Sequence, residues 1–213
     1  MKMLKSLALG SVALSTSLLS NVLTSQQSQA AIIFSFQQVG SDVTMTSSGS
    51  IDTAGLVAAN FQGWGDTGVE ENGQTDLMGG TNAGSINLTF SFNPGTDFSA
   101  WQTGNPFDNS FFGFSVSSGS KGFSTYSRDA SFNLVPGLGV RDSDLNGTVW
   151  SPDQNWIATG QTLASIGLNP GTYTVTDAVS GESITYQVVP EPLTMLGAGA
   201  AVAFGAAFKR RKA

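Results

Sequence analysis

The stretch Ile86–Phe92, which reads INLTFSF, decides the fold class of this chain. Its apolar residues fall on every second position with polar residues between them, which is the period of a strand with one buried face. The segment Ile184–Val188 repeats this alternation, with Thr185 and Gln187 between its apolar residues. Two such stretches, one near the middle and one near the end of the chain, indicate a protein built from β-strands.

Turn residues predict how several of the strands are connected. Gly40-Ser41 lies between the alternating segments Phe34–Gln38 and Val43–Met45, and a glycine at the first position of a two-residue turn favours a β-hairpin. A second hairpin is expected to join Thr172–Val179 to Ser183–Val189 across Ser180-Gly181. Further strands are predicted for Phe111–Ser117, Gly122–Tyr126, Ala130–Val135 and Asn155–Ala158.

The middle of the chain, residues 31–189, predicts one all-β domain, an antiparallel β-sandwich of jelly-roll-like form. Short strands follow one another between Gly, Asn, Ser and Pro turns, and about 160 residues suit a single domain. The stretch Gly63–Gly84 is rich in glycine and acids and poor in apolar residues, so we expect a long surface loop there.

This middle part is strongly acidic. It keeps three of the nine basic residues and fourteen of the fifteen acidic ones, which gives it a net charge of −11. Such a domain repels nucleic acid, so no nucleic-acid partner is expected. The chain has neither His nor Cys, which excludes Ser-His-Asp triads, His metal ligands and thiol chemistry. A pair of carboxylates of the glycosidase type stays open as an enzymatic alternative.

The end of the chain, residues 190–213, has the features of a sorting signal. Pro190-Glu191-Pro192 is followed by an uncharged, small-residue run from Leu193 to Phe208 and then by the cations Lys209 to Lys212. As a helix, the run would reach roughly 24 Å, a little short of the hydrocarbon thickness of a membrane. The terminal cations favour a cytoplasmic C-terminus. We therefore expect a C-terminal transmembrane helix that holds the preceding domain outside the inner membrane.

The beginning of the chain is typical of a signal peptide over residues 1–30. A positive region at Lys2 and Lys5 overlaps the start of an apolar segment from Leu4 to Leu23. Ser28-Gln29-Ala30 matches the small-x-small pattern that signal peptidase cleaves, which predicts a cut between Ala30 and Ala31. Export by the Sec machinery is the expected consequence.

The C-terminal motif, the apolar run and the Arg-containing end together resemble the sorting signal of PEP-CTERM proteins, and the chain is similar to cyanobacterial members. The resemblance implies that the membrane enzyme exosortase recognises the signal and removes it near the motif. It assigns Pro190, Glu191 and Pro192 to the motif, and Arg210 and Arg211 to the basic stop.

A second segment carries the same resemblance. Leu163–Thr174, LASIGLNPGTYT, is similar to a run that precedes the anchor in many PEP-CTERM proteins. Those proteins often end this strand in Thr-Trp, where this chain has Val175-Thr176-Asp177. The departure means that the surface chemistry of the family does not transfer to this strand.

One loop has the spacing of a calcium-binding loop. Oxygen-bearing side chains stand at positions 1, 3, 5 and 12 of Asp142–Asp153, with Gly147 at position 6, as in EF-hand loops. An Asx-rich turn between two strands explains the same residues without a metal. The candidate Ca²⁺ ligands are Asp142, Asp144, Asn146, Thr148 and Asp153, and no other cofactor is expected.

Aromatic residues suggest a second kind of site. Trp64 and Trp101 are candidates for stacking against sugar rings, which would make extracellular polysaccharide a partner. The alternative is that these rings are core residues. The expected function is therefore that of a non-enzymatic structural protein of the cell surface or extracellular matrix. A carbohydrate-binding module acting on exopolysaccharide is the alternative, and a secreted hydrolase is a third reading.

Overall fold

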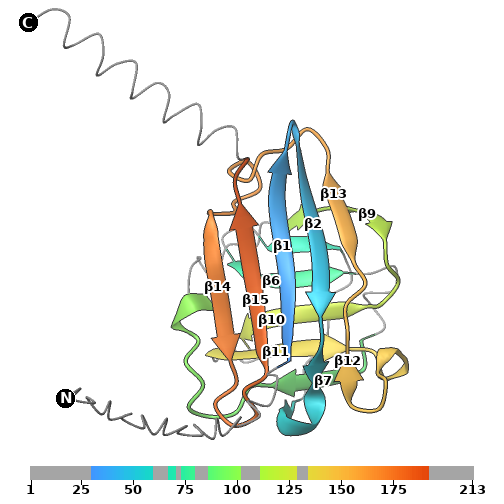
Figure 1. Cartoon of the computed structure of the whole chain (residues 1–213), viewed down its shortest axis with the longest axis vertical. Helices are drawn as coiled ribbons and strands as arrows, with labels where there is room; N and C mark the ends of the chain where they lie inside the picture. Colours follow the sequence, from blue (N-terminus) through green and yellow to red (C-terminus); the bar gives the residue numbers. More distant parts are fainter. Residues whose placement is uncertain are drawn as a thin grey trace, which may run out of the picture.

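The computed structural model of the protein describes residues 30–59, 67–70, 73–79, 86–101, 111–128 and 134–191. Two large β-sheets contain most of these residues, and the helical segments among them are three-residue 3-10 turns (Figure 1). The prediction of an all-β domain is therefore confirmed.

The first sheet, which we name the front sheet, has six strands in the order β14-β15-β1-β2-β13-β9. The last strand in the sequence, β15, thus lies inside the sheet, between β14 and β1. The bounds are β1 (Ala31–Val39), β2 (Asp42–Gly49), β9 (Ser115–Ser118), β13 (Asn155–Ala158), β14 (Gly171–Thr176) and β15 (Ser183–Val189).

The second sheet, the back sheet, has seven strands in the order β4-β7-β11-β10-β6-β5-β8. Its bounds are β4 (Val57–Ala58), β5 (Gly68–Glu70), β6 (Gly73–Gly79), β7 (Leu88–Ser91), β8 (Phe111–Gly113), β10 (Phe123–Arg128) and β11 (Leu134–Val140). The remaining elements are a two-stranded sheet of β3 (Ile51–Asp52) and β12 (Val149–Trp150), and the 3-10 turns η1 (Thr53–Gly55), η3 (Ser99–Trp101) and η4 (Asp142–Asp144).

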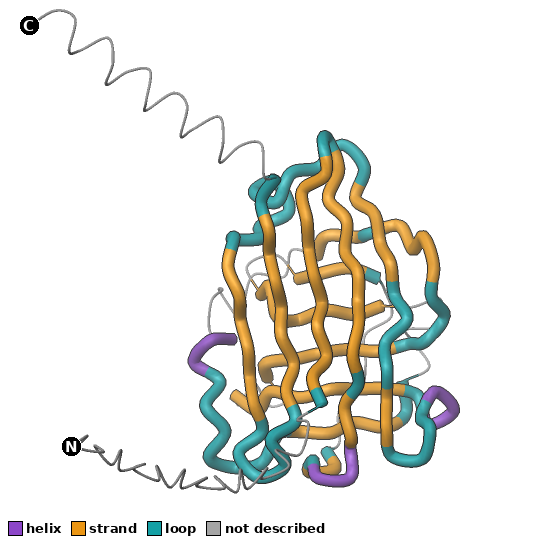
Figure 2. The backbone as a smooth tube through the Cα atoms, viewed as in Figure 1, coloured by secondary structure: helices purple, strands orange, loops and turns teal. Residues whose placement is uncertain are grey.

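The strands of the back sheet cross behind those of the front sheet at a steep angle (Figure 2). The alternating residues of the strands meet in the space between the two sheets. Phe34 of β1 stacks on Phe123 of β10 with ring centroids 4.9 Å apart, and Phe123 also stacks on Trp156 of β13 at 5.8 Å. This is the core of a β-sandwich, and its main contacts are between aromatic rings.

The pairing of β1 with its neighbours confirms one prediction and corrects another. Val39 pairs with Asp42, and Gly40 has φ of +59°, so Gly40-Ser41 forms the expected two-residue hairpin turn. On its other side β1 runs parallel to β15. A jelly roll is an antiparallel architecture, so the prediction of an antiparallel, jelly-roll-like sandwich is wrong at this pair.

Three of the strand predictions also need correction. The stretch Gly63–Gly84 was expected to be a loop, but it contains β5 and β6, whose Val69, Leu77 and Met78 are buried. The single strand expected at Phe111–Ser117 is interrupted at Phe114, where the chain passes from the back sheet to the front sheet. The second hairpin forms with a longer turn, because β14 ends at Thr176.

Other expected elements lie beyond the residues that the structure describes. These are the signal peptide up to residue 29 and the apolar run of residues 193–208. Among the described residues, no helix is long and apolar enough to cross a membrane.

Candidate functional site

The described part of the predicted sorting motif lies where the front sheet ends. Gln37 of β1 pairs with Val189, the last residue of β15, so Pro190 and Glu191 emerge beside the β1–β2 hairpin. The backbone N–H of Gly40 donates to Oε1 of Glu191 at 3.3 Å. The other predicted motif residues, Pro192, Arg210 and Arg211, are outside the described part of the chain. We call this end of the sandwich the exit end.

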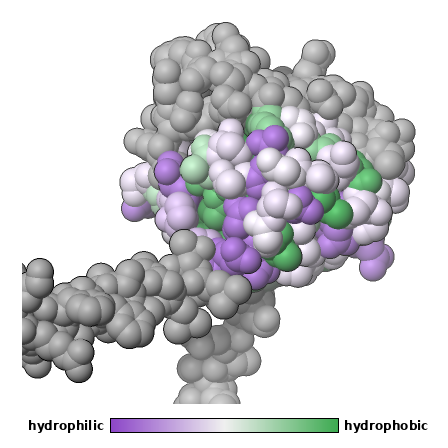
Figure 3. Space-filling model, turned by 90° about the horizontal axis from the view of Figure 1, so that it is seen from above, coloured by the Kyte–Doolittle hydropathy of each residue, from purple (hydrophilic) through white to green (hydrophobic). Residues whose placement is uncertain are grey.

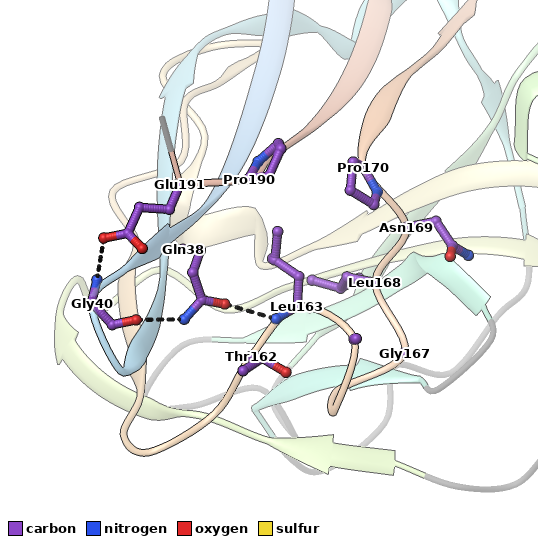
Figure 4. A pocket seen from close by; sticks show the side chains of 11 residues that line it. Gln38, Gly40, Thr162, Leu163, Gly167, Leu168, Asn169, Pro170, Pro190 and Glu191 are labelled. Carbon is purple, nitrogen blue, oxygen red and sulfur yellow. Dashed lines mark hydrogen bonds between the residues drawn. The ribbon is translucent and has the colours of Figure 1, made fainter. Parts of the chain in front are cut away.

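A pocket of about 630 Å³ opens at the exit end, and three separate segments form it (Figure 4). They are the β1–β2 hairpin, the loop between β13 and β14, and the chain that follows β15. Its lining includes Gln38, Leu163, Ala164, Leu168, Pro190 and Glu191. The pocket thus joins Pro190 and Glu191 to the first part of the segment Leu163–Thr174.

Gln38 fixes the hairpin and the loop relative to each other. Its Nε2 donates to the carbonyl oxygens of Gly40 at 3.0 Å and Gln161 at 3.1 Å, and its Oε1 accepts from the backbone N–H of Leu163 at 2.9 Å. A single amide therefore satisfies backbone groups from two segments more than 120 residues apart in the sequence. The pocket wall is formed in advance rather than by a binding partner.

The loop between β13 and β14 is also attached to the core. Leu163, Ile166 and Leu168 are buried in the main hydrophobic cluster, and the hydroxyl of Tyr173 donates to the carbonyl oxygen of Asn169 at 3.1 Å. The exposed side chain of Ala164 lies between the first two of these buried anchors. The loop therefore presents its outer residues on a rigid support.

The pocket has a lining of low charge. Among its lining residues, Glu191 alone carries a charge, and the others are apolar, amide, hydroxyl or glycine residues. A pair of acid and base groups would need a second titratable side chain here. Seen from above, this end of the molecule carries polar and apolar side chains side by side (Figure 3). Such a surface fits an extended peptide or a protein surface.

Ala30 and Ala31, the predicted cleavage residues, lie at the opposite end of the front sheet. Ala31 is the first residue of β1, and the carbonyl oxygen of Ala30 accepts from the N–H of Ser183 at 3.2 Å. Gly49 approaches Ala31 so closely that a Cβ at this position, where φ is +87°, would collide with the Ala31 carbonyl oxygen. The beginning of β1 is thus packed tightly against β2 and β15.

Carboxylates gather at this opposite end, where they support the fold. Oδ1 of Asp52 accepts from the N–H of Ala54 at 3.0 Å, and Oε2 of Glu182 accepts from the N–H of Asp52 at 3.0 Å. Burial raises the pKa of Glu182, and the charges of Asp52 and Asp177 raise it further. These carboxylates cap backbone N–H groups.

The three carboxylates among the five candidate calcium ligands do not form one metal-binding group. Oδ2 of Asp144 accepts from Nε of Arg141 at 2.7 Å, so this carboxylate is held in an ion pair. Asn146 and Thr148 belong to the turn that leads into β12, where Asn146 forms a β-bridge with Val149. In the described residues, no three carboxylates lie in a group that could hold a metal ion. The prediction that Asp142, Asp144 and Asp153 contribute to one calcium site is therefore wrong.

Asp153 has a different role from that of a calcium ligand. Its two carboxylate oxygens accept from the N–H groups of Ser120 at 3.0 Å and Lys121 at 3.1 Å. Burial alone would raise the pKa of Asp153, but these hydrogen bonds outweigh it and lower the pKa. The carboxylate thus anchors the turn before β10.

Trp101, predicted as a sugar-stacking residue, lies inside the sandwich. Its side chain is only 3% exposed and packs against Phe92 and Tyr186, so neither face of the ring is open to a ligand. This prediction is wrong because the ring is needed to fill the core beside η3. Trp64, the other predicted stacking residue, belongs to a part of the chain that the structure leaves undescribed.

The outer face of the front sheet presents an unexpected surface. Its side chains form cross-strand rows, one of which joins Thr172, Gln187, Ser35 and Thr46 in register. Further uncharged residues on this face include Ile33, Gln37, Thr44, Ser48, Asn155, Ile157, Thr174, Thr176, Ser183 and Thr185. Apart from Asp42 at the hairpin end of β2, the described residues of this face are thus uncharged, and most of them carry hydroxyl or amide groups.

Pro190 and Glu191 belong to the motif predicted from the sequence, but the pocket around them was not predicted. The pocket depends on the parallel pairing of β1 with β15, and residue periodicity contains no information about which strands become neighbours. The resemblance of Leu163–Thr174 was the available signal, since it marked the second wall before its position was known.

Comparisons with known proteins give no relative for this arrangement. No family model, no curated protein and no solved structure matches the chain.

Proposed function

We propose that this chain is an exported structural protein of the cell surface or extracellular matrix, with a C-terminal signal of the PEP-CTERM type. The observation that carries the proposal is the agreement between the sandwich and the two processing points expected from the sequence. The first strand begins at Ala31, directly after the expected signal-peptidase cut, and the last strand ends at Val189, directly before the motif.

Processing at these points would leave the sandwich complete. Ala31 pairs with Ser183 and Val189 pairs with Gln37, so both terminal residues belong to the front sheet. A cut before Ala31 or near Pro190–Pro192 removes no strand of the described fold. In this proposal, the Sec machinery exports the chain, residues 193–208 hold it in the inner membrane, and exosortase then releases it.

The distribution of acids favours an orientation with the exit end toward the membrane. Asp52, Asp177 and Glu182 lie at the opposite end of the front sheet, whereas Asp42 and Glu191 are the acids described around the exit end. Anionic lipid repels carboxylates, so this orientation keeps the larger group of carboxylates away from the bilayer.

The test is to determine both termini of the protein made from the full chain in a host that contains an exosortase. We expect mass spectrometry of the surface or matrix fraction to find Ala31 as the first residue and to find that the residues beyond the motif are absent. As the matched control, a chain with alanine at Pro190, Glu191 and Pro192 should keep its C-terminal segment and stay in the membrane fraction. Intact chain in the cytosol, bearing Met1 and Ala213, contradicts the proposal.

The outer face of the front sheet favours a second function, binding to a neutral polysaccharide. Hydroxyl and amide groups both donate and accept hydrogen bonds, as sugar hydroxyls do, and the part of the face away from Asp42 avoids the cost of desolvating ions. This function would be compatible with a structural role in a polysaccharide matrix.

Introducing acids into one row of this face tests the second function. Glutamate at Thr46 and Thr172 should weaken retention in gels that contain dextran, xylan or hydroxyethyl cellulose by about tenfold, because two charges would have to be desolvated. The control carries glutamate at Ala54 and Val179, which are exposed positions outside the face. Equal retention of both variants, or no retention of the unchanged domain, counts against polysaccharide binding there.

A further inference from the structure

We infer that the pocket at the exit end is a docking surface for the peptidase that processes the motif, so that the peptidase reads the folded domain together with the motif. This inference rests on the proposed function and adds a second recognition element to it. The element is contributed by Gln38, Leu163, Ala164, Leu168 and the hairpin turn at Gly40, all of which precede the motif in the sequence.

No spacer separates the described fold from the motif. Val189 is the last residue of β15 and is paired with Gln37, and Pro190 follows it directly. Two residues of extended chain span only about 7 Å. Pro190 and Glu191 therefore remain among the residues of the exit end, and a peptidase that grips them must touch the neighbouring hairpin and loop.

The domain holds the described part of the motif in a defined position. Pro190 and Glu191 both line the pocket, and Oε1 of Glu191 accepts from the N–H of Gly40. Pro190 has a restricted φ, which limits the directions in which the chain can leave β15. A partially fixed peptide loses less conformational entropy on binding than a free tail.

The pocket wall is rigid, and its outer surface is accessible. Gln38 bonds the hairpin to the loop, and Leu163, Ile166 and Leu168 anchor the loop in the core. Ala164 is exposed at the pocket, where its small side chain leaves space. Rigid surfaces with both polar and apolar residues around an extended segment are typical of sites that bind another protein.

The charge of the pocket indicates which groups a docking peptidase would present. Glu191 is the charged residue among those lining it, so a docking peptidase has one carboxylate to satisfy. Cationic or hydrogen-bond-donating groups on the peptidase would complement this carboxylate and the carbonyl oxygens of the loop. The acids at the opposite end of the sandwich stay outside this contact.

The experiment follows the processing rate of the full chain by pulse-chase in an exosortase-containing host. One variant has a flexible Gly/Ser linker between Val189 and Pro190, long enough to place the motif roughly 17 Å from the pocket on average with about ten residues. A second has Ala164→Trp, which places a large ring at the pocket and leaves the sequence of the motif unchanged. The matched control has Ala54→Trp, on the exposed η1 turn at the opposite end.

We expect the linker and Ala164→Trp each to slow processing by about tenfold and Ala54→Trp to leave it unchanged. Circular dichroism and thermal unfolding of the purified variants establish that each is folded. If the unchanged chain is processed and both pocket variants keep its rate, the docking surface is wrong although the proposed function stands. A faster rate for the linker variant also overturns the inference, because the domain would then hinder the peptidase. If the unchanged chain is not processed at all, the proposed function itself fails.

Discussion

Replacing Asp177 by alanine is expected to lower the free energy of unfolding by about 3–5 kcal/mol, because it breaks a buried network around a charged group. Asp177 is 2% exposed, and its carboxylate accepts from the backbone N–H groups of Asn93, Val179 and Ser180. The carboxylate also accepts from the side chains of Asn93 and Ser180. Removing it leaves several donors without a partner and detaches the segment after β7 from the turn between β14 and β15.

Urea unfolding of the domain, followed by intrinsic fluorescence, measures this effect. Asp97→Ala is the matched control, since Asp97 is exposed and its Oδ1 accepts from the N–H of Ser99 on the surface. An equal change in the two variants would mean that the network around Asp177 does not hold the sheets together.

The contribution of Asp177 is expected to depend on pH. Burial alone would raise the pKa of Asp177, but the hydrogen bonds from Asn93 and Ser180 outweigh it, and the pKa lies below its ordinary value of 3.8. The stabilisation is therefore fully present above that value and is lost as the pH falls through the lowered pKa. Glu182, whose pKa is raised, acts in the opposite sense, since protonation relieves its burial. The difference between the unchanged domain and Asp177→Asn should accordingly shrink in acid.

Replacing Trp156 by alanine is expected to cost about 3–5 kcal/mol, because it empties the centre of the core. The Trp156 ring is fully buried, stacks on Phe123 at 5.8 Å and packs against Phe114 at 5.7 Å. Its Nε1 donates to Oε1 of Gln154 at 3.1 Å. Trp156→Phe keeps part of this volume and should cost clearly less in the same urea experiment. Equal losses for the two variants would contradict a packing origin.

Gly79→Ala probes the same contact from the back sheet. A Cβ at Gly79 would overlap the six-membered ring of Trp156, so the methyl group has no room unless the ring moves. Overpacking of this kind usually costs about 1–3 kcal/mol. The close approach explains why a strand residue without a side chain faces this tryptophan ring of the core.

Local patterns in the sequence predicted the strands that have one buried face and tight turns. The Gly40-Ser41 hairpin and Asn155–Ala158 were correct because alternation and turn residues are properties of neighbouring positions. The stretch Gly63–Gly84 was misread as a loop because glycines and acids hid the few buried residues of β5 and β6. The low strand propensity of this stretch was outweighed by its pairing with other strands.

The candidate site was predictable only in part, for a related reason. The motif residues Pro190 and Glu191 could be read from local sequence, but their proximity to Leu163 and Gln38 depends on sheet order. The prediction of a calcium loop was wrong because Asp144 pairs with Arg141 and Asp153 caps a turn. Such partners are determined by the tertiary fold. The prediction for Trp101 was wrong because the residue type alone does not distinguish a buried aromatic ring from an exposed one.

The position of β15 inside the front sheet has a consequence for how the chain is made. The neighbours β1 and β15 are separated by almost the whole domain in sequence, so the native contact order is high and folding should be slow. During synthesis, the sheet lacks an internal strand until the residues just before Pro190 have been released. A nascent chain of this topology stays unfinished for nearly all of its elongation, which is the state that a channel for unfolded polypeptides requires.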